Sequence, residues 1–450
     1  MKKYDKYKKS GIQWVGQIPE HWNVTKIKNI FSFARGLNIK KTDLVASGVP
    51  VISYGQIHSK MNTGTCVNEV SVRYVPSSFT EQKESCKTRI GDFIFADTSE
   101  DKEGCGNCVY IDKEGIFAGY HSIILNGDNR DNKYLAYLFK SSEWRSQIRS
   151  QVKGVKVYSI TQSILSESTV LIPSSDEQRD IAAYLDDKTG KIDKATEAIN
   201  KQIDDLRAYR QSLISETVTK GLNPDAPMKD SGIQWIGQIP KHWDCVKLRY
   251  LVATPLLYGA SESGESDKPS FPRYIRITDI TENGKLRNSG AKYLNPTIAK
   301  RYMLEPGDIL FARSGATVGK TFLFTESYPA CFAGYLIKVS CGEKLLPSFL
   351  YNFTKSGEYQ NWVNSISTQA TIQNIGADKY SDLIIPLPSP DEQEAISAFL
   401  DKKTAKIDDA IKALETQRDD LALLKQSLIS EAVTGKVDVR GWNSNNETRN

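Results

Sequence analysis

Hydrophobic residues recur at every seventh position in two long segments of the chain, residues 176–219 and 391–434. A heptad spacing of apolar side chains is typical of a helix that buries one stripe against a second helix. Each segment also begins with an Asp-Glu pair, which suits the positive end of a helix dipole. The pattern therefore predicts two long helices that pair with each other. The heptad positions are Leu185, Ile192, Ile199, Leu206 and Leu213 in the first segment and Leu400, Ile407, Leu414, Leu421 and Leu428 in the second.

The two segments are copies within a duplicated chain. The hexapeptide Gln-Ser-Leu-Ile-Ser-Glu occurs at 211–216 and again at 426–431. A second repeated motif, Ser-Gly-Ile-Gln-Trp-x-Gly-Gln-Ile-Pro-x-His-Trp, occupies 10–22 and 231–243. The order along the chain is motif, variable region and long helix, twice. Since 450 residues are enough for two or more hydrophobic cores, each repeat is expected to hold a domain of its own.

The two variable regions, 23–172 and 244–386, consist of short apolar runs separated by turn residues. This pattern predicts short strands with occasional short helices. The fold class is therefore α/β or α+β, with two domains of mixed strands and short helices joined by the two long helices. The expected strands are 89–96, 116–125, 169–173, 306–312 and 381–386, and the expected short helices are 134–148 and 349–363.

The repeats also predict the boundaries of the chain's parts. Segment 220–230 contains Pro and Gly, so a linker is expected there. The arm at 2–9 carries five lysines and is expected to be mobile unless DNA or a partner orders it, and the polar tail is expected to be loose. The expected parts are a first motif at 1–22, a first domain at 23–172, a central helix at 173–222, a linker and second motif at 223–243, a second domain at 244–386, a last helix at 387–437 and a tail at 438–450.

Composition narrows the class of protein. Hydrophobic residues make up 39% of the chain and charged residues 25%, as in ordinary soluble proteins, and no apolar run approaches the ~18 residues of a membrane span. No secretory signal is recognisable, and seven irregularly spaced cysteines suit reduced thiols, so a cytoplasmic protein is expected. The net charge of +5 permits an anionic partner such as nucleic acid without requiring one.

The combination of repeats resembles the specificity subunit of type I restriction-modification systems. The resemblance covers nearly the whole chain and depends on the paired Gln-Trp-x-Gly-Gln-Ile-Pro-x-His-Trp motifs, the Gly-Asp turns before Phe-Ala and the Asp-Glu-Gln helix starts. It implies that each variable region recognises one half of a split DNA target. It also implies that the helices pair antiparallel, hold the domains apart and dock two methyltransferase subunits, which restriction subunits join.

The same resemblance implies that this chain is not an enzyme by itself. Neither an Asn-Pro-Pro-aromatic nor an Asp-Pro-Pro-aromatic tetrapeptide is present, so the sequence offers no adenine-methylating site. No cofactor and no metal are expected on this chain, because S-adenosylmethionine, ATP and Mg²⁺ would belong to the partner subunits. Since the variable regions differ strongly, the target should be asymmetric. Helices of about 43 residues at ~1.5 Å per residue are long enough to set the gap between two half-sites.

Candidate DNA-binding residues are polar side chains next to expected strands, because Arg, Lys, Asn, Gln, Ser and Thr contact base edges and phosphates. In the first domain these are Arg35, Tyr54, Gln56, Lys153, Lys156 and Tyr158, and in the second they are Arg276, Thr278, Arg313, Ser314, Gln369, Thr371 and Gln373. Candidate partner-docking residues are Trp14, Trp22, Trp235, Trp243, Leu185, Ile192, Leu206, Leu400, Ile407 and Leu421.

Several motifs allow other interpretations. The segment Gly315–Thr321 resembles a phosphate-binding loop but has three residues between its glycines where four are needed, and a strand is expected after it. The Cys105-x-x-Cys108 pair has the spacing of a zinc site, although a second close pair is missing. His21 and His242, within the repeated motif, favour packing or docking over catalysis. The rival functions are therefore a coiled-coil scaffold that does not bind DNA and a nucleotide hydrolase.

Overall fold

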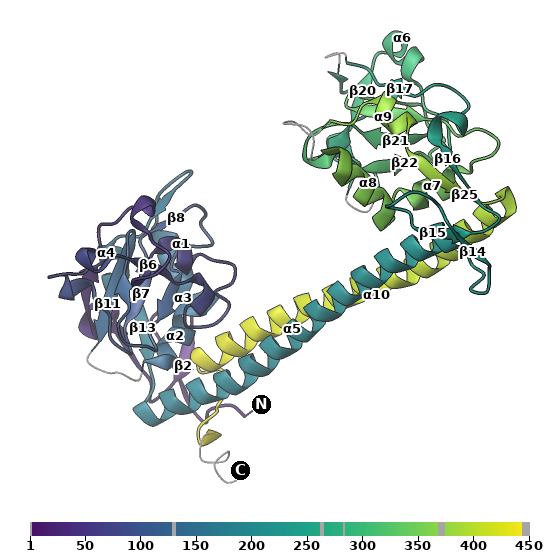
Figure 1. Ribbon diagram of the computed structural model, residues 1–450. Coiled ribbons are helices and arrows are strands. Elements are labelled where there is room, and N and C mark those ends of the chain that lie inside the picture. Colours follow the sequence, from purple (N-terminus) through teal and green to yellow (C-terminus); the bar gives the residue numbers. More distant parts are fainter. Residues whose placement is uncertain (1, 128–131, 262–264, 282–283, 368–373, 443–450) are drawn as a thin grey trace. The chain divides into compact units, whose positions relative to one another are not determined.

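The computed structural model describes residues 2–127, 132–261, 265–281, 284–367 and 374–442 (Figure 1). It divides into two compact units. The first unit comprises Met1–Ile199 and Thr416–Asn450, and the second comprises Asn200–Glu415. Each unit therefore combines one variable domain, one copy of the repeated motif and a part of each long helix.

Both predicted long helices are confirmed. Helix α5 (Ser175–Lys220) has 46 residues and helix α10 (Pro390–Val433) has 44. Pro390 opens α10, where its fixed φ suits the first helical position and its missing N–H costs no bond. Across the described residues, neither these nor the shorter helices are apolar enough over sufficient length to cross a membrane.

The two helices lie side by side within each unit. In the first unit, Lys425 Nζ on α10 is 2.6 Å from Asp193 Oδ1 on α5. In the second unit, Arg207 on α5 pairs with Glu415 at 3.1 Å, and Arg210 pairs with Asp408 at 2.9 Å. Because the partners on α10 run backwards as the residues on α5 advance, the helices are antiparallel there, as predicted.

The first domain is built on a four-stranded antiparallel sheet and a smaller sheet. The central strand β7 contains only buried side chains, Phe-Ile-Phe-Ala, which explains its uninterrupted apolar run. The strand order of the larger sheet is β4 (Phe31–Arg35), β11 (Ser122–Gly127), β7 (Phe93–Ala96) and β9 (Cys108–Tyr110). The smaller sheet has the order β10 (Phe117–Ala118), β5 (Val49–Ile52) and β6 (Arg73–Val75), with β10 parallel to β5.

The second domain repeats this arrangement with different residues. Its central strand β21 also consists of four buried residues. The larger sheet has the order β17 (Leu257–Tyr258), β24 (Leu336–Val339), β21 (Ile309–Ala312) and β22 (Thr321–Leu323). The smaller sheet has the order β18 (Glu265–Ser266), β20 (Lys292–Leu294), β19 (Arg273–Ile275) and β23 (Ala330–Phe332), with β19 parallel to β23.

Smaller elements complete each unit. Two-stranded pairs are β1 (Tyr7–Lys9) with β2 (Gln17–Pro19), β3 (Asn23–Lys26) with β13 (Thr169–Ile172), β8 (Thr98–Ser99) with β12 (Tyr158–Ser159), β14 (Met228–Asp230) with β15 (Gln238–Pro240), and β16 (Asp244–Lys247) with β25 (Ile384–Leu387). The short helices are α1 (Tyr54–Ile57), α2 (Lys133–Lys140), α3 (Ser142–Gln151), α4 (Gln162–Glu167), α6 (Pro296–Ala299), α7 (Pro347–Phe353), α8 (Gly357–Ser367) and α9 (Ala377–Ser381).

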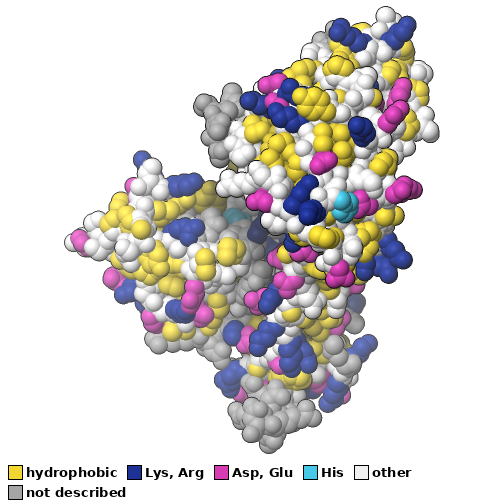
Figure 2. All heavy atoms as spheres, turned by 45° about the vertical axis from the view of Figure 1, so that its right-hand side comes forward, with side chains coloured by type: hydrophobic (Ala, Val, Ile, Leu, Met, Phe, Trp, Pro, Cys, Tyr) yellow, Lys and Arg dark blue, Asp and Glu magenta, His cyan; other side chains and the backbone are white. Residues whose placement is uncertain are grey.

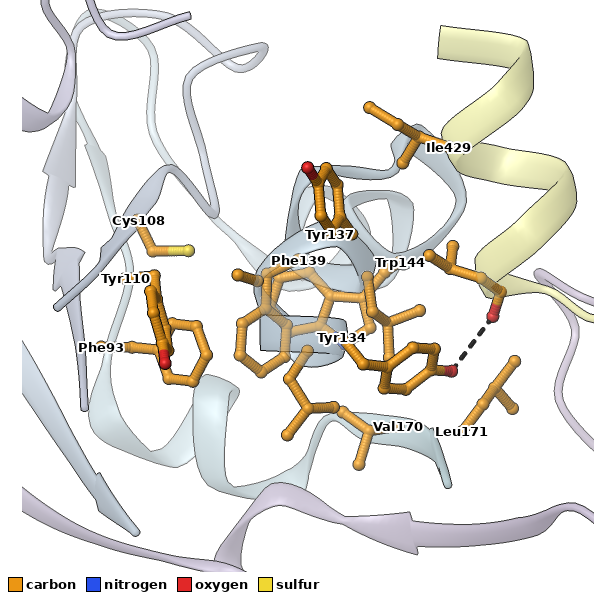
Figure 3. Close-up of a cluster of buried hydrophobic side chains, with 14 of the residues drawn as sticks. Phe93, Cys108, Tyr110, Tyr134, Tyr137, Phe139, Trp144, Val170, Leu171 and Ile429 are labelled. Carbon is orange, nitrogen blue, oxygen red and sulfur yellow. Dashed lines mark hydrogen bonds between the residues drawn. The ribbon is translucent and has the colours of Figure 1, made fainter. Parts of the chain in front are cut away.

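An aromatic core joins the first domain to the end of α10 (Figure 3). The ring of Phe139 on α2 lies 4.9 Å from Phe93 on β7 and 4.5 Å from Trp144 on α3. On the other side of α2, the hydroxyl of Tyr134 donates to the carbonyl of Val433 at 3.2 Å (Figure 3). The last turn of α10 is therefore part of this domain's core.

Three predicted elements are wrong in detail. The strand expected at 116–125 is two strands, β10 and β11, because His121 between them adopts a positive φ of 53°. The helix expected at 134–148 is divided into α2 and α3 by Ser141, whose side chain accepts from the backbone N–H of Trp144 and caps α3. The helix expected at 349–363 is likewise divided into α7 and α8.

The linker, the arm expected to be mobile and the first residues of the tail expected to be loose all contain ordered structure. The linker contains β14, and the lysine-rich arm contains β1 and the buried Tyr4. In the tail, Val439 is buried and the Trp442 ring lies 5.0 Å from Tyr184, whereas residues 443–450 lie outside the described residues. A few apolar side chains hold these segments, and their spacing has no periodic pattern.

Candidate DNA-recognition surface and helix anchors

The repeated motif anchors the start of a long helix. In the first unit, Trp22 Nε1 donates to Glu177 Oε1 at 2.9 Å, and His21 Nε2 lies 2.8 Å from Glu177 Oε2. Glu177 is in the first turn of α5, where its charge also suits the helix dipole. Trp22 is completely buried, so this first Trp-Glu clamp ties the motif to the helix from inside the core.

The second unit contains an equivalent second Trp-Glu clamp. Trp243 Nε1 donates to Glu392 Oε1 at 3.2 Å, and His242 Nε2 lies 2.9 Å from the same oxygen. Burial acts to raise the pKa of the Glu392 carboxyl, but hydrogen bonds from His242, Trp243 and Ser389 outweigh it and lower the pKa to about 2. The structure thus gives both motif histidines a structural role at a helix start.

Most of the predicted docking residues are used inside the chain. Trp22, Trp243, Leu185 and Leu400 are fully buried, and Ile192 and Ile407 are buried in the helix pair. Trp14, Trp235, Leu206 and Leu421 are half-buried. Docking through these residues stays a prediction, and only the half-buried ones offer surface for it.

The helices expose other apolar residues that the sequence analysis missed. In the second unit Tyr209 is 56% exposed, and in the first unit Leu423 and Leu424 are 65% and 48% exposed. None of them occupies a heptad position, so they lie outside the stripe that seals the helix pair. An apolar residue off the stripe of a strongly heptad helix is the signal that could have identified them.

In the first domain, the predicted residues Tyr54 and Arg35 lie near one end of the larger sheet. The Tyr54 ring on α1 lies 5.4 Å from the Tyr120 ring and 5.6 Å from the His121 ring. Arg35 is exposed at the end of β4, opposite Ile123 of β11. This end of the larger sheet, the sheet edge of the first domain, therefore carries an arginine and aromatic side chains from three separate segments.

The remaining first-domain candidates lie beside the same edge. Gln56 Oε1 accepts from the backbone N–H of Ser53 at 3.0 Å and so caps α1. Tyr158 on β12 pairs with Ser99 of β8, the strand that follows β7. Lys153 and Lys156 are exposed on the segment that leads into β12.

The sequence analysis missed Asp97 and His121 at this edge. Asp97 Oδ1 accepts from Thr98 Oγ1 at 2.8 Å and lies 3.2 Å from His121 Nδ1. Nearby, His58 Nε2 lies 2.9 Å from the Thr98 carbonyl oxygen, so this nitrogen carries a proton and fixes the strand end. The position of Asp97 directly after the repeated Phe-Ala could have identified it, since Arg313 follows the other copy.

In the second domain, Arg276 is occupied by acidic neighbours. Its guanidinium donates to Asp279 at 2.9 Å and to Glu265 at 3.3 Å, and it also donates to the Gly290 carbonyl at 3.1 Å. The hydrogen bonds to Asp279 raise the pKa of Arg276. Arg276 therefore stabilises the smaller sheet. Its contact with DNA stays a prediction, as does that of the exposed Thr278.

Arg313 occupies the corresponding edge of the second domain. Its guanidinium carbon lies 4.8 Å from the centre of the Tyr258 ring, a cation–π geometry. Its Nε is buried and has no hydrogen-bond partner among the described residues. Ser314 forms a β-bridge with Asn374. The candidates Gln369, Thr371 and Gln373 lie outside the described residues.

The segment Gly315–Thr321 is not a phosphate-binding loop. A single 3₁₀ turn at Gly315–Thr317 leads into β22, which pairs antiparallel with β21. A phosphate-binding loop needs the N-terminus of a helix after its glycines, and here a hairpin takes that place. The predicted strand after this segment is confirmed, so this segment does not support the interpretation as a nucleotide hydrolase.

The cysteine pair has the properties of buried thiols. Burial raises the pKa of Cys108 to about 12 and also raises the pKa of Cys105. A structural zinc site needs four ligands, usually with a second close pair. Within the described ranges, histidine, cysteine and carboxylate side chains form no group of three or more that could hold a metal ion.

Surface charge is mixed. Figure 2 shows lysine and arginine side chains interspersed with aspartate and glutamate over the face that it draws. This agrees with the modest net charge of +5. Any recognition of DNA would therefore depend on particular side chains at the sheet edges more than on one large basic surface.

Comparison with known proteins identifies one family. The model of the type I restriction modification DNA specificity domain matches residues 19–205 and 260–417, that is, one stretch in each repeat. The type I restriction enzyme MjaVIII specificity subunit of Methanocaldococcus jannaschii is 24% identical, over 95% of this chain and 95% of its own length. The EcoKI specificity subunit of Escherichia coli K12 is 23% identical, over 96% of this chain and 92% of its own length.

Solved structures share the fold. A chain from work on complex assembly and conformational transition of the type I R-M system aligns with a TM-score of 0.70 at 17% identity, covering 94% of this chain and 99% of that chain. The HsdS subunit from Thermoanaerobacter tengcongensis aligns with a TM-score of 0.51 at 17% identity, covering 93% of this chain and 98% of that chain.

Proposed function

The chain belongs to the type I restriction-modification DNA specificity family, and from this membership we propose that each of its two domains recognises one half of a split DNA target. The long helices would then dock two methyltransferase subunits. In this proposal the chain selects the target and performs no chemistry itself. Restriction subunits would join the same complex for cleavage.

One observation supports target recognition by two domains. Both domains have the same strand order in the larger sheet and a parallel pair in the smaller sheet, which has one more strand in the second domain, yet their side chains differ at the sheet edge. The edge of the first domain carries Arg35 and Asp97, and the edge of the second carries Tyr258 and Arg313. A scaffold protein has no reason to keep a frame and change the polar groups at its sheet edge, whereas a protein that recognises two different half-sites must change them.

The duplicated helices support the docking of two partners. A chain with two copies of one helix and one motif offers the same kind of surface twice, which suits two copies of one partner. Each unit exposes apolar side chains on its helix pair, Tyr209 in one and Leu423 with Leu424 in the other. Exposed apolar residues beside a sealed helix seam are typical of protein interaction sites.

The cofactors of the reaction belong to the partners in this proposal. S-adenosylmethionine would be held by the methyltransferase subunits, and ATP with Mg²⁺ by the restriction subunits. The chain's own contribution is the position of two recognition surfaces on one pair of helices. Its substrate is double-stranded DNA.

The test is long-read methylome sequencing of cells that express this chain with its cognate methyltransferase subunit. Cells that lack the chain serve as the control. The expected result is a new split motif with adenine methylated on both strands, and two different half-sites. If the complex assembles, as shown by co-purification, but no new motif appears, the chain would act as a scaffold that does not recognise DNA.

A further inference from the structure

Asp97 and Arg313 occupy the same position in the two domains. The backbone N–H of Asp97 donates to the His121 carbonyl at 3.1 Å, and its own carbonyl accepts from Ile160 at 2.8 Å. The backbone N–H of Arg313 donates to the Tyr335 carbonyl at 3.1 Å, and its carbonyl accepts from Ile375 at 2.8 Å. Each residue directly follows the buried central strand of its domain.

The two side chains at this position have opposite charge. Asp97 is a carboxylate whose side chain is 34% exposed, and Arg313 is a half-buried guanidinium. The backbone hydrogen bonds that define the position are the same with either residue, so the frame does not require a particular charge. The difference in charge therefore indicates that the two side chains contact different groups outside their own domains.

The surroundings hold the Asp97 carboxylate in one orientation. Oδ1 accepts from Thr98 Oγ1, and His121 Nδ1 lies beside it. His121 has a positive φ of 53°, which is rare for a residue with a side chain and persists only where the neighbours enforce it. Among the described residues no hydrogen bond reaches Oδ2, so this oxygen can accept from a ligand.

The surroundings hold Arg313 in a similar way. Its guanidinium lies over the Tyr258 ring, and the Tyr258 hydroxyl is itself fixed by accepting from the backbone N–H of Ala377 at 2.8 Å. A stacked guanidinium keeps its plane, which preserves the fork of donors that two acceptors on one base require.

We propose that Asp97 and Arg313 are the equivalent specificity-determining residues of the two domains, each contacting one base pair in the major groove. Asp97 accepts from the exocyclic amino group of a cytosine, and Arg313 donates to O6 and N7 of a guanine. This proposal depends on the proposed recognition of DNA by both domains. It predicts that each half-site contains one G·C pair whose identity is set by one of these residues.

The test uses the full chain assembled with its methyltransferase subunit. After the wild-type motif is known from the methylome, the methylomes of cells that express Asp97→Asn or Arg313→Gln are sequenced in the same way, since both changes remove the charge and leave a polar amide. Each change should relax one base pair in one half-site and leave the other half-site unchanged. On duplexes substituted at that pair, at fixed salt, the wild-type preference of about tenfold to a hundredfold should fall to near one.

Matched controls are Glu81→Ala in the first domain and Arg301→Ala in the second, because both residues are exposed and lie away from the sheet edge. They should leave the motif and the preference unchanged. An unchanged motif in Asp97→Asn and Arg313→Gln would overturn the proposal, and so would relaxation of both half-sites by one change. Loss of all methylation with an unchanged melting temperature would also overturn it, because reading of a single base pair cannot abolish binding altogether. A wild-type chain without any split motif would instead reject the proposed function itself.

Discussion

The two Trp-Glu clamps join the same three residue types, but their surroundings differ. In the first, the Glu177 side chain is 2% exposed, and in the second the Glu392 side chain is 38% exposed. Tyr4 accounts for much of the difference, because its ring lies 5.7 Å from His21 and 6.1 Å from Trp22. The same motif is therefore sealed in one unit and partly open in the other.

The segments beside the two clamps are connected differently. In the second unit one continuous segment connects α5 to β14, and the residue that corresponds to Tyr4, three before the strand, is Asp225. In the first unit two separate segments meet, and Asp438 N–H donates to the Lys2 carbonyl at 2.9 Å. Identical local motifs can thus differ in stability when distant segments cover only one of them.

The largest expected effect comes from removing the tryptophans. Trp22→Ala and Trp243→Ala should each lower the free energy of unfolding by about 3–5 kcal/mol, because each ring is fully buried and its loss leaves a cavity. Urea unfolding followed by circular dichroism measures this. Trp14→Phe, a change at a half-buried motif residue, is the control, and a loss below about 1 kcal/mol for Trp22→Ala would show that the clamp is not part of the core.

Substitution of the two glutamates should distinguish the stabilities of the two clamps more clearly. Glu177→Gln should cost about 2–3 kcal/mol, since a buried carboxylate loses its charge-assisted bonds to His21 and Trp22. Glu392→Gln should cost less than about 1 kcal/mol, because solvent screens the more exposed pair. Urea unfolding of both variants measures the two losses in the free energy of unfolding. Equal losses would contradict the difference in burial between the two carboxylates.

Substitution of the glycines that follow the two helices should give a smaller difference in stability. Gly435 and Gly221 have φ of +72° and +77°, so Ala at either position costs about 1–2 kcal/mol of backbone strain. At Gly435 an added Cβ would also collide with the Pro19 ring, whereas at Gly221 its nearest neighbour is Trp243 Cζ2 at 3.1 Å. Melting temperatures should therefore fall further for Gly435→Ala than for Gly221→Ala, and the reverse order would refute the tighter closure of the first clamp.

The smallest expected effect is a pH dependence of the second clamp. The pKa of Glu392 is lowered from 4.5 to about 2 in the folded chain, so its stabilising contribution is complete above about pH 4.5. As the pH falls through the folded pKa, the carboxyl takes up its proton and the contribution disappears. The melting temperatures of wild type and Glu392→Gln should therefore differ by a constant amount above pH 4.5 and converge toward pH 2. A difference that stays constant to pH 2 would exclude this carboxyl as the source.

Much of the fold followed from the sequence, but less of the candidate site did. The heptads predicted the ends of α5 and α10 to within one residue, because the apolar spacing of a helix depends on residues close together in the sequence. Three candidates from the sequence, Arg35, Tyr54 and Tyr158, lie near one sheet edge, and their contact with DNA stays a prediction. It could not show that Arg276 is occupied by Asp279 and Glu265, because those contacts depend on side-chain geometry.

The sequence by itself determined the duplication, the two long helices and the presence of two domains with different surfaces, since repeats and heptads are properties of neighbouring residues. Only the tertiary structure decided which backbone partners, such as His121 and Tyr335, hold Asp97 and Arg313, because hydrogen bonds between distant residues leave no local pattern. The tertiary structure also decided that Tyr4 covers the first clamp, on a segment where Lys2 pairs with Asp438. Contacts between residues as distant as Lys2 and Asp438 leave no periodic pattern, so no stretch of the sequence could reveal them.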